Sequence, residues 1–114
     1  MGIGTIRRGT ILFFIKIGGN IAGFVLVENM GSETSSLHSI AEFFVTKKYR
    51  RHGVGKVAAM KAFDLFGGRW EVMQIEKNAR ARAFWRNVIG EYTNGRFEER
   101  FYDGKYYQRF FARV

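Results

Sequence analysis

The clearest pattern near the start of the chain is a pair of short apolar runs. Residues 11–17 (ILFFIKI) and 21–27 (IAGFVLV) flank the triplet GGN. Two β-rich runs separated by a short Gly/Asn loop predict a β-hairpin. Residues 37–46 (LHSIAEFFVT) predict a third strand, which is apolar on both faces except at Glu42. Such a strand is expected at the centre of a sheet and covered on both sides.

The periodicity changes after this strand. From Val54 the apolar residues recur with a helical period, which predicts a helix that ends at the glycine pair 67–68. Residues 70–75 (WEVMQI) form the next predicted strand. Because this strand follows a helix that itself follows a strand, residues 37–75 predict a βαβ unit with one parallel strand pair and a right-handed crossover.

The last third of the chain predicts a second helix and a second hairpin. Asn78 is a good N-cap for a helix whose apolar stripe runs to Gly90. Residues 91–102 and 105–112 are strand-like and are joined by Asp-Gly, a strong hairpin signal.

Together these elements predict an α/β (α+β) fold with the element order ββ-β-α-β-α-ββ. The sheet is expected to be mixed and mostly antiparallel, with one parallel pair and with helices packed on it. The chain has no proline and no repeat or low-complexity tract that would mark a boundary, so residues 1–114 are expected to form a single domain.

The amino-acid composition limits the kinds of site and partner that the chain can have. The chain has no cysteine, which excludes disulfides, a thiolate nucleophile and a thiolate metal site. The longest apolar run is far shorter than the roughly 20 residues that span a bilayer, so a soluble cytoplasmic protein is expected. The formal net charge of +9 favours an anionic partner. The net charge alone does not tell whether this partner is a nucleic acid, a membrane surface or a phosphorylated cofactor.

Basic residues gather where the predicted strand 37–46 meets the following helix. A glycine-rich turn that opens a helix presents unpaired backbone N–H groups and the positive end of the helix dipole, which favours phosphate. Gly53 and Gly55 would allow positive φ angles and a close approach of the backbone to an oxygen. The spacing is neither that of a P-loop nor that of a dinucleotide fingerprint. The residues predicted to hold phosphate are Arg50, Arg51, His52, Gly53, Val54, Gly55 and Lys56.

Two motifs together resemble the GNAT superfamily of acyl-CoA-dependent N-acetyltransferases. Residues 50–55 match its R-x-x-G-x-G pyrophosphate loop, and residues 78–85 (NARARAFW) are similar to its second signature, N-x-R-A-x-x-[LF]-Y. The resemblance implies that acetyl-CoA is the co-substrate and that the loop holds its pyrophosphate. It also implies that Phe44 and Val45 bind the pantetheine arm through their backbone and that Asn78 lies beside it. The two parallel strands would splay apart to admit the thioester.

Transfer of an acetyl group to an amine needs a base, because an ammonium ion has no lone pair with which to attack. Glu42 is the candidate. The family often has a carboxylate on this strand, and burial among Ile40 and Phe44 would raise the pKa of Glu42 toward a useful range. The alternative is that Glu42 only forms a structural ion pair with a basic neighbour such as Arg80.

The second signature departs from the family at its last position. Trp85 stands where a tyrosine commonly protonates the departing CoA thiolate, and an indole N–H is not a usable acid near neutral pH. Trp85 is therefore expected to wall the thioester or to belong to the core. Tyr92 is a distant substitute and is expected to be structural. No His, Asp or Glu cluster has the spacing of metal ligands, so no metal is expected.

Only about ten residues precede the first predicted strand. Family members normally begin with a strand and one or two helices that wall the acceptor pocket, so we expect a domain that lacks these elements. Three explanations are open: a second subunit supplies the wall, the pocket is unusually open to a macromolecular substrate, or the start of the chain is late or shortened. The expected acceptor is a small-molecule or peptide amine, and a homodimer is expected because it would cover exposed apolar surface. A membrane partner is not expected. Two other functions stay open: a non-catalytic CoA-binding module and, less favoured because the aromatic residues fall at regular core positions, a nucleic-acid-binding domain.

Overall fold

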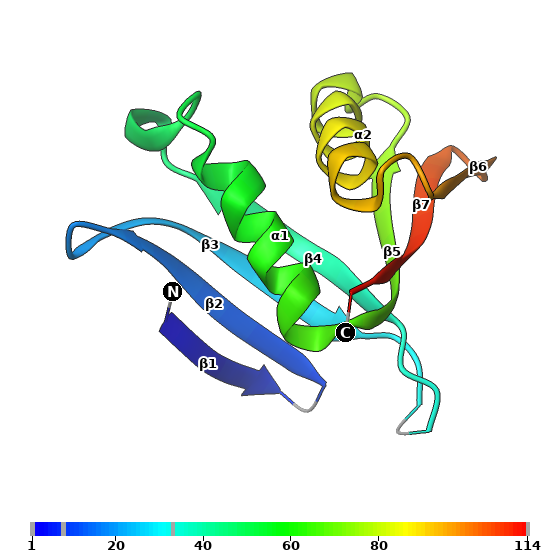
Figure 1. Cartoon of the computed structure of the whole chain (residues 1–114), viewed down its shortest axis with the longest axis horizontal. Coiled ribbons are helices and arrows are strands. Elements are labelled where there is room, and N and C mark those ends of the chain that lie inside the picture. Colours follow the sequence, from blue (N-terminus) through cyan, green and yellow to red (C-terminus); the bar gives the residue numbers. More distant parts are fainter. Residues whose placement is uncertain (1, 8, 33, 114) are drawn as a thin grey trace.

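The computed structural model describes residues 2–7, 9–32 and 34–113. Seven strands form one sheet in the order β1-β2-β3-β4-β5-β7-β6, and only β4 and β5 are parallel (Figure 1). The predicted fold class is confirmed. Among the described residues, no helix is long and apolar enough to cross a membrane. The elements are β1 (Gly2–Arg7), β2 (Thr10–Ile17), β3 (Asn20–Asn29), β4 (His38–Val45), the 3-10 helix η1 (Lys47–Tyr49), α1 (Val54–Phe66), β5 (Gly68–Ile75), α2 (Ala79–Thr93), β6 (Glu98–Tyr102) and β7 (Lys105–Ala112).

Both predicted hairpins are confirmed. The turn between β2 and β3 contains Gly18 and Gly19, with φ of 56° and 85°. The turn between β6 and β7 contains Asp103 and Gly104, with φ of 51° and 75°. Two successive positive φ angles are typical of the type I′ turn, whose twist matches the twist of the flanking strands. Local turn chemistry therefore explains why both hairpins could be predicted.

An additional strand, β1, precedes the first predicted one. It pairs antiparallel with β2, with Gly2 opposite Phe14, after a turn in which Gly9 has a φ of 79°. The expectation that no strand precedes residue 11 is therefore wrong. Residues 2–7 include two glycines, which weaken the strand signal of the β-branched residues between them, and pairing with β2 stabilises their extended conformation. In the described parts of the chain, no helix lies between β1 and β4.

Helix α2 continues past Gly90, where its end was predicted, to Thr93. Tyr92 lies on the apolar stripe of this last turn and is buried. Its burial offsets the cost of about 1 kcal/mol for a glycine within a helix. The strand predicted to start at residue 91 is therefore wrong in its first part, because β6 begins after the helix and a turn.

The core lies between the sheet and the two helices. Phe63 of α1 makes edge-on ring contacts with Trp70 of β5, Tyr92 of α2 and Phe110 of β7, at centroid distances of 4.9, 5.1 and 4.8 Å. Phe110 also contacts Tyr92, with ring centroids 6.1 Å apart. Since one residue of β7 touches both helices, α1 and α2 cover the same face of the sheet.

The opposite face of the sheet, here called the outer face, carries no helix among the described residues (Figure 1). Phe44 is 43% exposed there and Phe111 is 74% exposed. The prediction that strand 37–46 is central is confirmed by its place between β3 and β5, but the expectation that both of its faces are covered is wrong. Among the residues whose side chains are described, the outer face carries the apolar side chains of Leu12, Phe14, Phe24, Leu26, Phe44, Met73, Ile75 and Phe111.

The parallel strands β4 and β5 splay apart, as predicted. Their only pairing in the described chain joins His38 to Trp70, whereas β5 pairs with β7 along its whole length. Beyond the His38–Trp70 pair the two strands separate toward their C-terminal ends (Figure 1). The result is a gap in the sheet that is closed at one end and open at the other.

A β-bulge interrupts β4 at Ala41. Successive residues of β3 pair with Ile40 and Glu42, so Ala41 has no partner in β3. The extra residue shifts the alternation, and both Ile40 and Phe43 pack against the core. Simple alternation along residues 37–46 predicts Ile40 on the same face as Glu42 and Phe44. The bulge instead places Ile40 on the helix side, while Glu42 and Phe44 lie on the outer face.

Candidate functional site

The loop between β4 and α1 combines two left-handed residues with an uncapped helix start. Arg51 has a φ of 68° and Gly53 a φ of 74°. Gly53 is the N-cap of α1 and has no side chain to bond the first N–H groups of the helix. These N–H groups and the positive end of the helix dipole are therefore available to an anion. One expectation is wrong: Gly55 is helical and does not have a positive φ.

Two of the predicted phosphate ligands are engaged within the protein. Arg50 turns back toward β4, where its Nε donates to the Val45 carbonyl oxygen (2.9 Å) and its guanidinium lies 5.8 Å from the centre of the Phe44 ring. Lys56 points to α2, where its Nζ lies 2.9 Å from a carboxylate oxygen of Glu91. Arg50 therefore ties the loop to β4, and Lys56 ties the first turn of α1 to α2.

Arg51 and His52 are exposed at the tip of the loop. Next to them, a concavity of ≈ 230 Å³ lies between the start of α1 and the end of β2, with Val54 in its lining. Lys16 and Lys61 also line it and add positive charge. Lys16 could not be assigned to this site from the sequence, because only the packing of β2 against α1 brings that residue to the loop.

Gly55 allows the first turn of α1 to approach two aromatic rings. A Cβ atom at this position would lie 3.4 Å from the Phe84 ring and 3.5 Å from the Phe43 ring. These two rings are in contact, with centroids 5.5 Å apart. The α-carbon of Gly55 therefore faces these two rings, where a methyl group would just fit and a larger side chain would be crowded.

The gap between β4 and β5 exposes a backbone edge of each strand. Beyond the His38–Trp70 pair, the edge of β4 that faces β5 has no strand partner among the described residues. Such an edge can bind an extended chain through main-chain hydrogen bonds. Phe44 and Val45 lie on this part of β4, although the Val45 carbonyl already accepts the bond from the loop arginine.

Asn78 follows the end of β5, at the open end of the gap. Its Oδ1 accepts a hydrogen bond from the N–H of Ala81 (3.1 Å), which caps α2. The cap explains why α2 begins here. It uses only the side-chain oxygen, so the amide nitrogen can donate to a ligand in the gap.

Glu42 is exposed on the outer face. It lines an open depression of ≈ 540 Å³ together with Phe24, Phe43 and Phe44. The expected burial of this carboxylate is wrong, because no helix of the described chain covers the outer face and the bulge at Ala41 turns Ile40 to the other side of the sheet. The alternative ion pair is also not formed: within the described part of the chain, Glu42 makes no hydrogen bond or ion pair.

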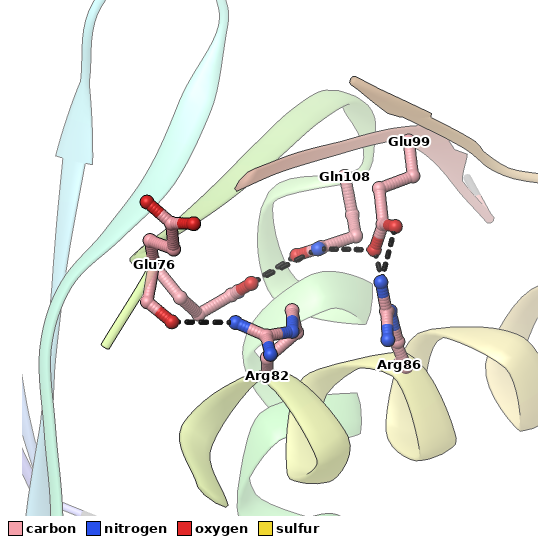
Figure 2. A network of polar contacts seen from close by, with 6 residues as sticks. Glu76, Arg82, Arg86, Glu99 and Gln108 are labelled. Carbon is pink, nitrogen blue, oxygen red and sulfur yellow. Dashed lines mark hydrogen bonds and ion pairs between the residues drawn. The ribbon is translucent and has the colours of Figure 1, made fainter. Parts of the chain in front are cut away.

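A polar network joins α2 to the strands beside the gap (Figure 2). Buried Gln74 of β5 and Gln108 of β7 exchange two hydrogen bonds of 2.7 and 2.9 Å. Gln108 also donates to Glu99 of β6 (2.8 Å), whose carboxylate accepts two bonds of 2.7 and 2.6 Å from Arg86 of α2. The hydrogen-bonded Arg86 guanidinium lowers the pKa of the Glu99 carboxyl. The network therefore fixes α2 relative to β5, β6 and β7.

The sequence matches the model of the Acetyltransferase (GNAT) family over residues 5–90. The chain belongs to the GNAT family. An acetyltransferase from Thermus thermophilus has 15% identity and a TM-score of 0.68, with 94% of this chain and 67% of that chain covered. A Bacillus subtilis acetyltransferase in complex with CoA has 12% identity and a TM-score of 0.66, with 93% and 79% covered. Arabidopsis thaliana NAA60 in complex with acetyl-CoA has 16% identity and a TM-score of 0.64, with 92% and 77% covered. No curated protein sequence gives a significant match.

The departure from the GNAT signature at Trp85 is explained by packing. Trp85 is 6% exposed, and its ring contacts Phe43 and Phe84 at centroid distances of 5.1 and 5.0 Å. Tyr92 is structural: its hydroxyl donates to Asp64 (2.6 Å), and burial and this carboxylate raise its pKa. Among the described residues, no group of three or more His, Asp or Glu side chains could hold a metal ion.

Proposed function

We propose that the chain is an N-acetyltransferase that moves the acetyl group of acetyl-CoA to a primary amine, by direct attack within a ternary complex. The observation that carries the proposal is the gap between β4 and β5, with the glycine loop and the uncapped start of α1 beside it. Membership of the GNAT family supports it, as do CoA and acetyl-CoA in two structural relatives.

The residues around the gap fit acetyl-CoA. The backbone N–H groups at the start of α1, together with Arg51 and His52, would hold the pyrophosphate. The lysines of the neighbouring concavity would bind a further phosphate. The backbone edge of residues 44–45 and the amide nitrogen of Asn78 would bind the pantetheine arm. When bound, acetyl-CoA supplies an activated acyl group and a thiolate leaving group.

Glu42 is proposed as the base that prepares the amine. Its carboxylate lies on the outer face without a described partner, so it can accept a proton from an ammonium group that arrives from that face. The neutral amine then attacks the thioester carbonyl carbon, so that a C–N bond forms and the C–S bond breaks. In this step the nitrogen loses one further proton, and water carries that proton to the departing thiolate, because Trp85 is buried and the Tyr92 hydroxyl is engaged with Asp64.

The open outer face supports an acceptor that is a small molecule or a peptide carrying a primary amine. Exposed apolar side chains on β5, such as Met73 and Ile75, favour a homodimer of this single GNAT domain, residues 1–114, that leaves the depression at Glu42 open. Light scattering at micromolar concentration is expected to give the mass of a dimer. A monomer mass would contradict this part of the proposal.

A specific observation favours a second candidate, a CoA-binding module without catalysis. Trp85 occupies the position of the acid in the second signature and is buried in the core. Such a module would bind acetyl-CoA and release no CoA with any amine. Nucleic-acid binding would instead appear as DNA affinity that is lost by about 200 mM salt, without affinity for CoA.

The test is an assay of free CoA release with a panel of amines: polyamines, aminoglycosides, acidic small molecules and peptide N-termini. Release that depends on both the amine and the protein supports the enzyme. Acetyl-CoA binding without release across the panel supports the module. Failure to bind acetyl-CoA at millimolar concentration would contradict both.

A further inference from the structure

A third concavity lies at the closed end of the β4–β5 gap. Its volume is ≈ 580 Å³, and its walls come from the start of β5, the end of β7 and the segment that leads from α2 into β6. Three of the residues that line it are arginines: Arg69, Arg96 and Arg109. We call it the arginine depression.

The charge of Arg109 is compensated within the sheet. Its Nε is hydrogen-bonded to a carboxylate oxygen of Glu71 on β5. On the other side, Glu98 of β6 is its cross-strand partner and also lines the depression. An ion pair of this kind is fixed in place and leaves little net positive charge for a ligand.

The other two arginines have no such compensation. Arg69 donates from a terminal nitrogen to the Ser35 hydroxyl (2.8 Å), a neutral acceptor that holds the side chain without neutralising it. Arg96 is exposed, and its guanidinium has no hydrogen bond or ion pair among the described residues. Two guanidinium groups that line one concavity without a carboxylate partner favour an anion there, because an anion can accept charge-assisted hydrogen bonds from both.

Apolar side chains line the same concavity. Leu37, Phe97 and Phe111 contribute to its walls, and Phe111 is 74% exposed. A bare phosphate ion would leave this surface in water, whereas a ligand with a ring or an alkyl group would cover it. The volume lies within the range of small-molecule sites, which is about 300–1,000 Å³.

We propose that the arginine depression binds a small organic anion, that is, a carboxylate or phosphate carried on an apolar group. Arg69 and Arg96 would bind the anionic group, and Phe111 would cover the apolar part. The site is separate from the loop before α1: the depression lies where β5 begins, and the loop lies toward the end where β5 finishes. The eight residues of β5 span about 25 Å.

The experiment is a titration of the full chain with phenyl phosphate, benzoate and inorganic phosphate, followed by two-dimensional NMR of the backbone amides. Saturable shifts are expected in residues 95–98 and 109–111. Phenyl phosphate and benzoate should each bind more tightly than inorganic phosphate, and the comparison of these two tells which anionic group the site prefers. Arg69→Gln and Arg96→Gln should each weaken binding by about tenfold, the worth of one charge-assisted hydrogen bond.

Arg100→Gln is the matched control, because Arg100 is exposed on neighbouring β6 and does not line the depression. It should leave the affinity within about twofold. Equal weakening by Arg100→Gln would indicate general attraction to a basic protein and would overturn the proposal. So would shifts confined to residues 50–57 that Arg51→Gln abolishes, since the anion would then sit at the loop. Equal affinity for all three probes would overturn the apolar part of the assignment. All variants concern exposed side chains, and far-ultraviolet circular dichroism checks that each is folded.

Discussion

Substitution of Gly55 separates a packing role of this glycine from a ligand-binding role. A Cβ atom at Gly55 would lie 3.4 Å from the Phe84 ring and 3.5 Å from the Phe43 ring, which are ordinary contact distances. Gly55→Ala therefore fits without movement of either ring. A helical alanine also costs about 0.5–1 kcal/mol less backbone entropy than glycine, so Gly55→Ala should match or exceed the stability of the parent protein.

Gly55→Val should behave differently. Its γ-methyl groups extend about 1.5 Å beyond Cβ, into space that the two rings already border. Overpacking of this size costs about 1–3 kcal/mol, because the rings or the first turn of α1 must shift. Urea denaturation of the two variants and the parent protein measures this difference directly.

The Gly55→Ala variant should also keep its affinity for acetyl-CoA. Because the α-carbon of Gly55 faces the aromatic pair, Gly55→Ala leaves the N–H groups of the loop accessible and should change the dissociation constant by no more than about threefold. Calorimetric titration with acetyl-CoA is the assay. A Gly55→Ala protein that is fully stable but binds acetyl-CoA more than about tenfold more weakly would show that Gly55 faces the ligand and not the aromatic rings, since the new methyl group would then have to contact acetyl-CoA.

Three further predictions concern the base and the polar network. Glu42→Gln should keep acetyl-CoA affinity but lower turnover at neutral pH by about 10²–10⁴, with a smaller loss at high pH where the amine is already neutral; full turnover would reject Glu42 as the base. Gln108→Leu leaves the buried Gln74 amide without two hydrogen bonds and should cost about 2–4 kcal/mol of unfolding free energy. The double variant with Gln74→Leu should cost less than the sum of the single changes, and additive costs in urea denaturation would argue against coupling. Because Arg86 lowers the pKa of Glu99, the carboxylate stabilises the fold above its ordinary pKa of 4.5 and loses this effect as the pH falls through the lowered value. The parent protein should therefore melt at a higher temperature than Glu99→Gln at pH 5, and this difference should shrink as the pH falls to 3. An unchanged difference would contradict the role assigned to Glu99.

Elements governed by local chemistry could be predicted from the sequence. The two hairpins follow from glycine, asparagine and aspartate at turn positions, and the start of α2 follows from the capping side chain of Asn78. The splayed parallel pair was implied by the family resemblance. The loop before α1 was predicted because glycine spacing and positive charge coincide there.

Features that depend on pairing or packing could not be predicted. Strand β1 is held by its ladder with β2, and the last turn of α2 is held by the burial of Tyr92. The bulge at Ala41 is a matter of register between β3 and β4, and it places Ile40 and Glu42 on opposite faces of the sheet. The engagement of Arg50 with the Val45 carbonyl depends likewise on how the loop folds back.

Binding of acetyl-CoA to the chain is the most direct test of whether the β4–β5 gap and the loop before α1 form a cofactor site. Acetyl-CoA at about 100 times its dissociation constant should raise the free energy of unfolding by about 2.7 kcal/mol, through binding to the folded state alone. The measurement is thermal unfolding of the full chain over a range of acetyl-CoA concentrations, with desulfo-CoA, which keeps the phosphates and the pantetheine arm, and free adenine as comparison ligands. The melting temperature should rise with acetyl-CoA and with desulfo-CoA and should not rise with adenine. A melting temperature that acetyl-CoA leaves unchanged up to millimolar concentration would contradict the proposed acetyl-CoA site and the function that depends on it.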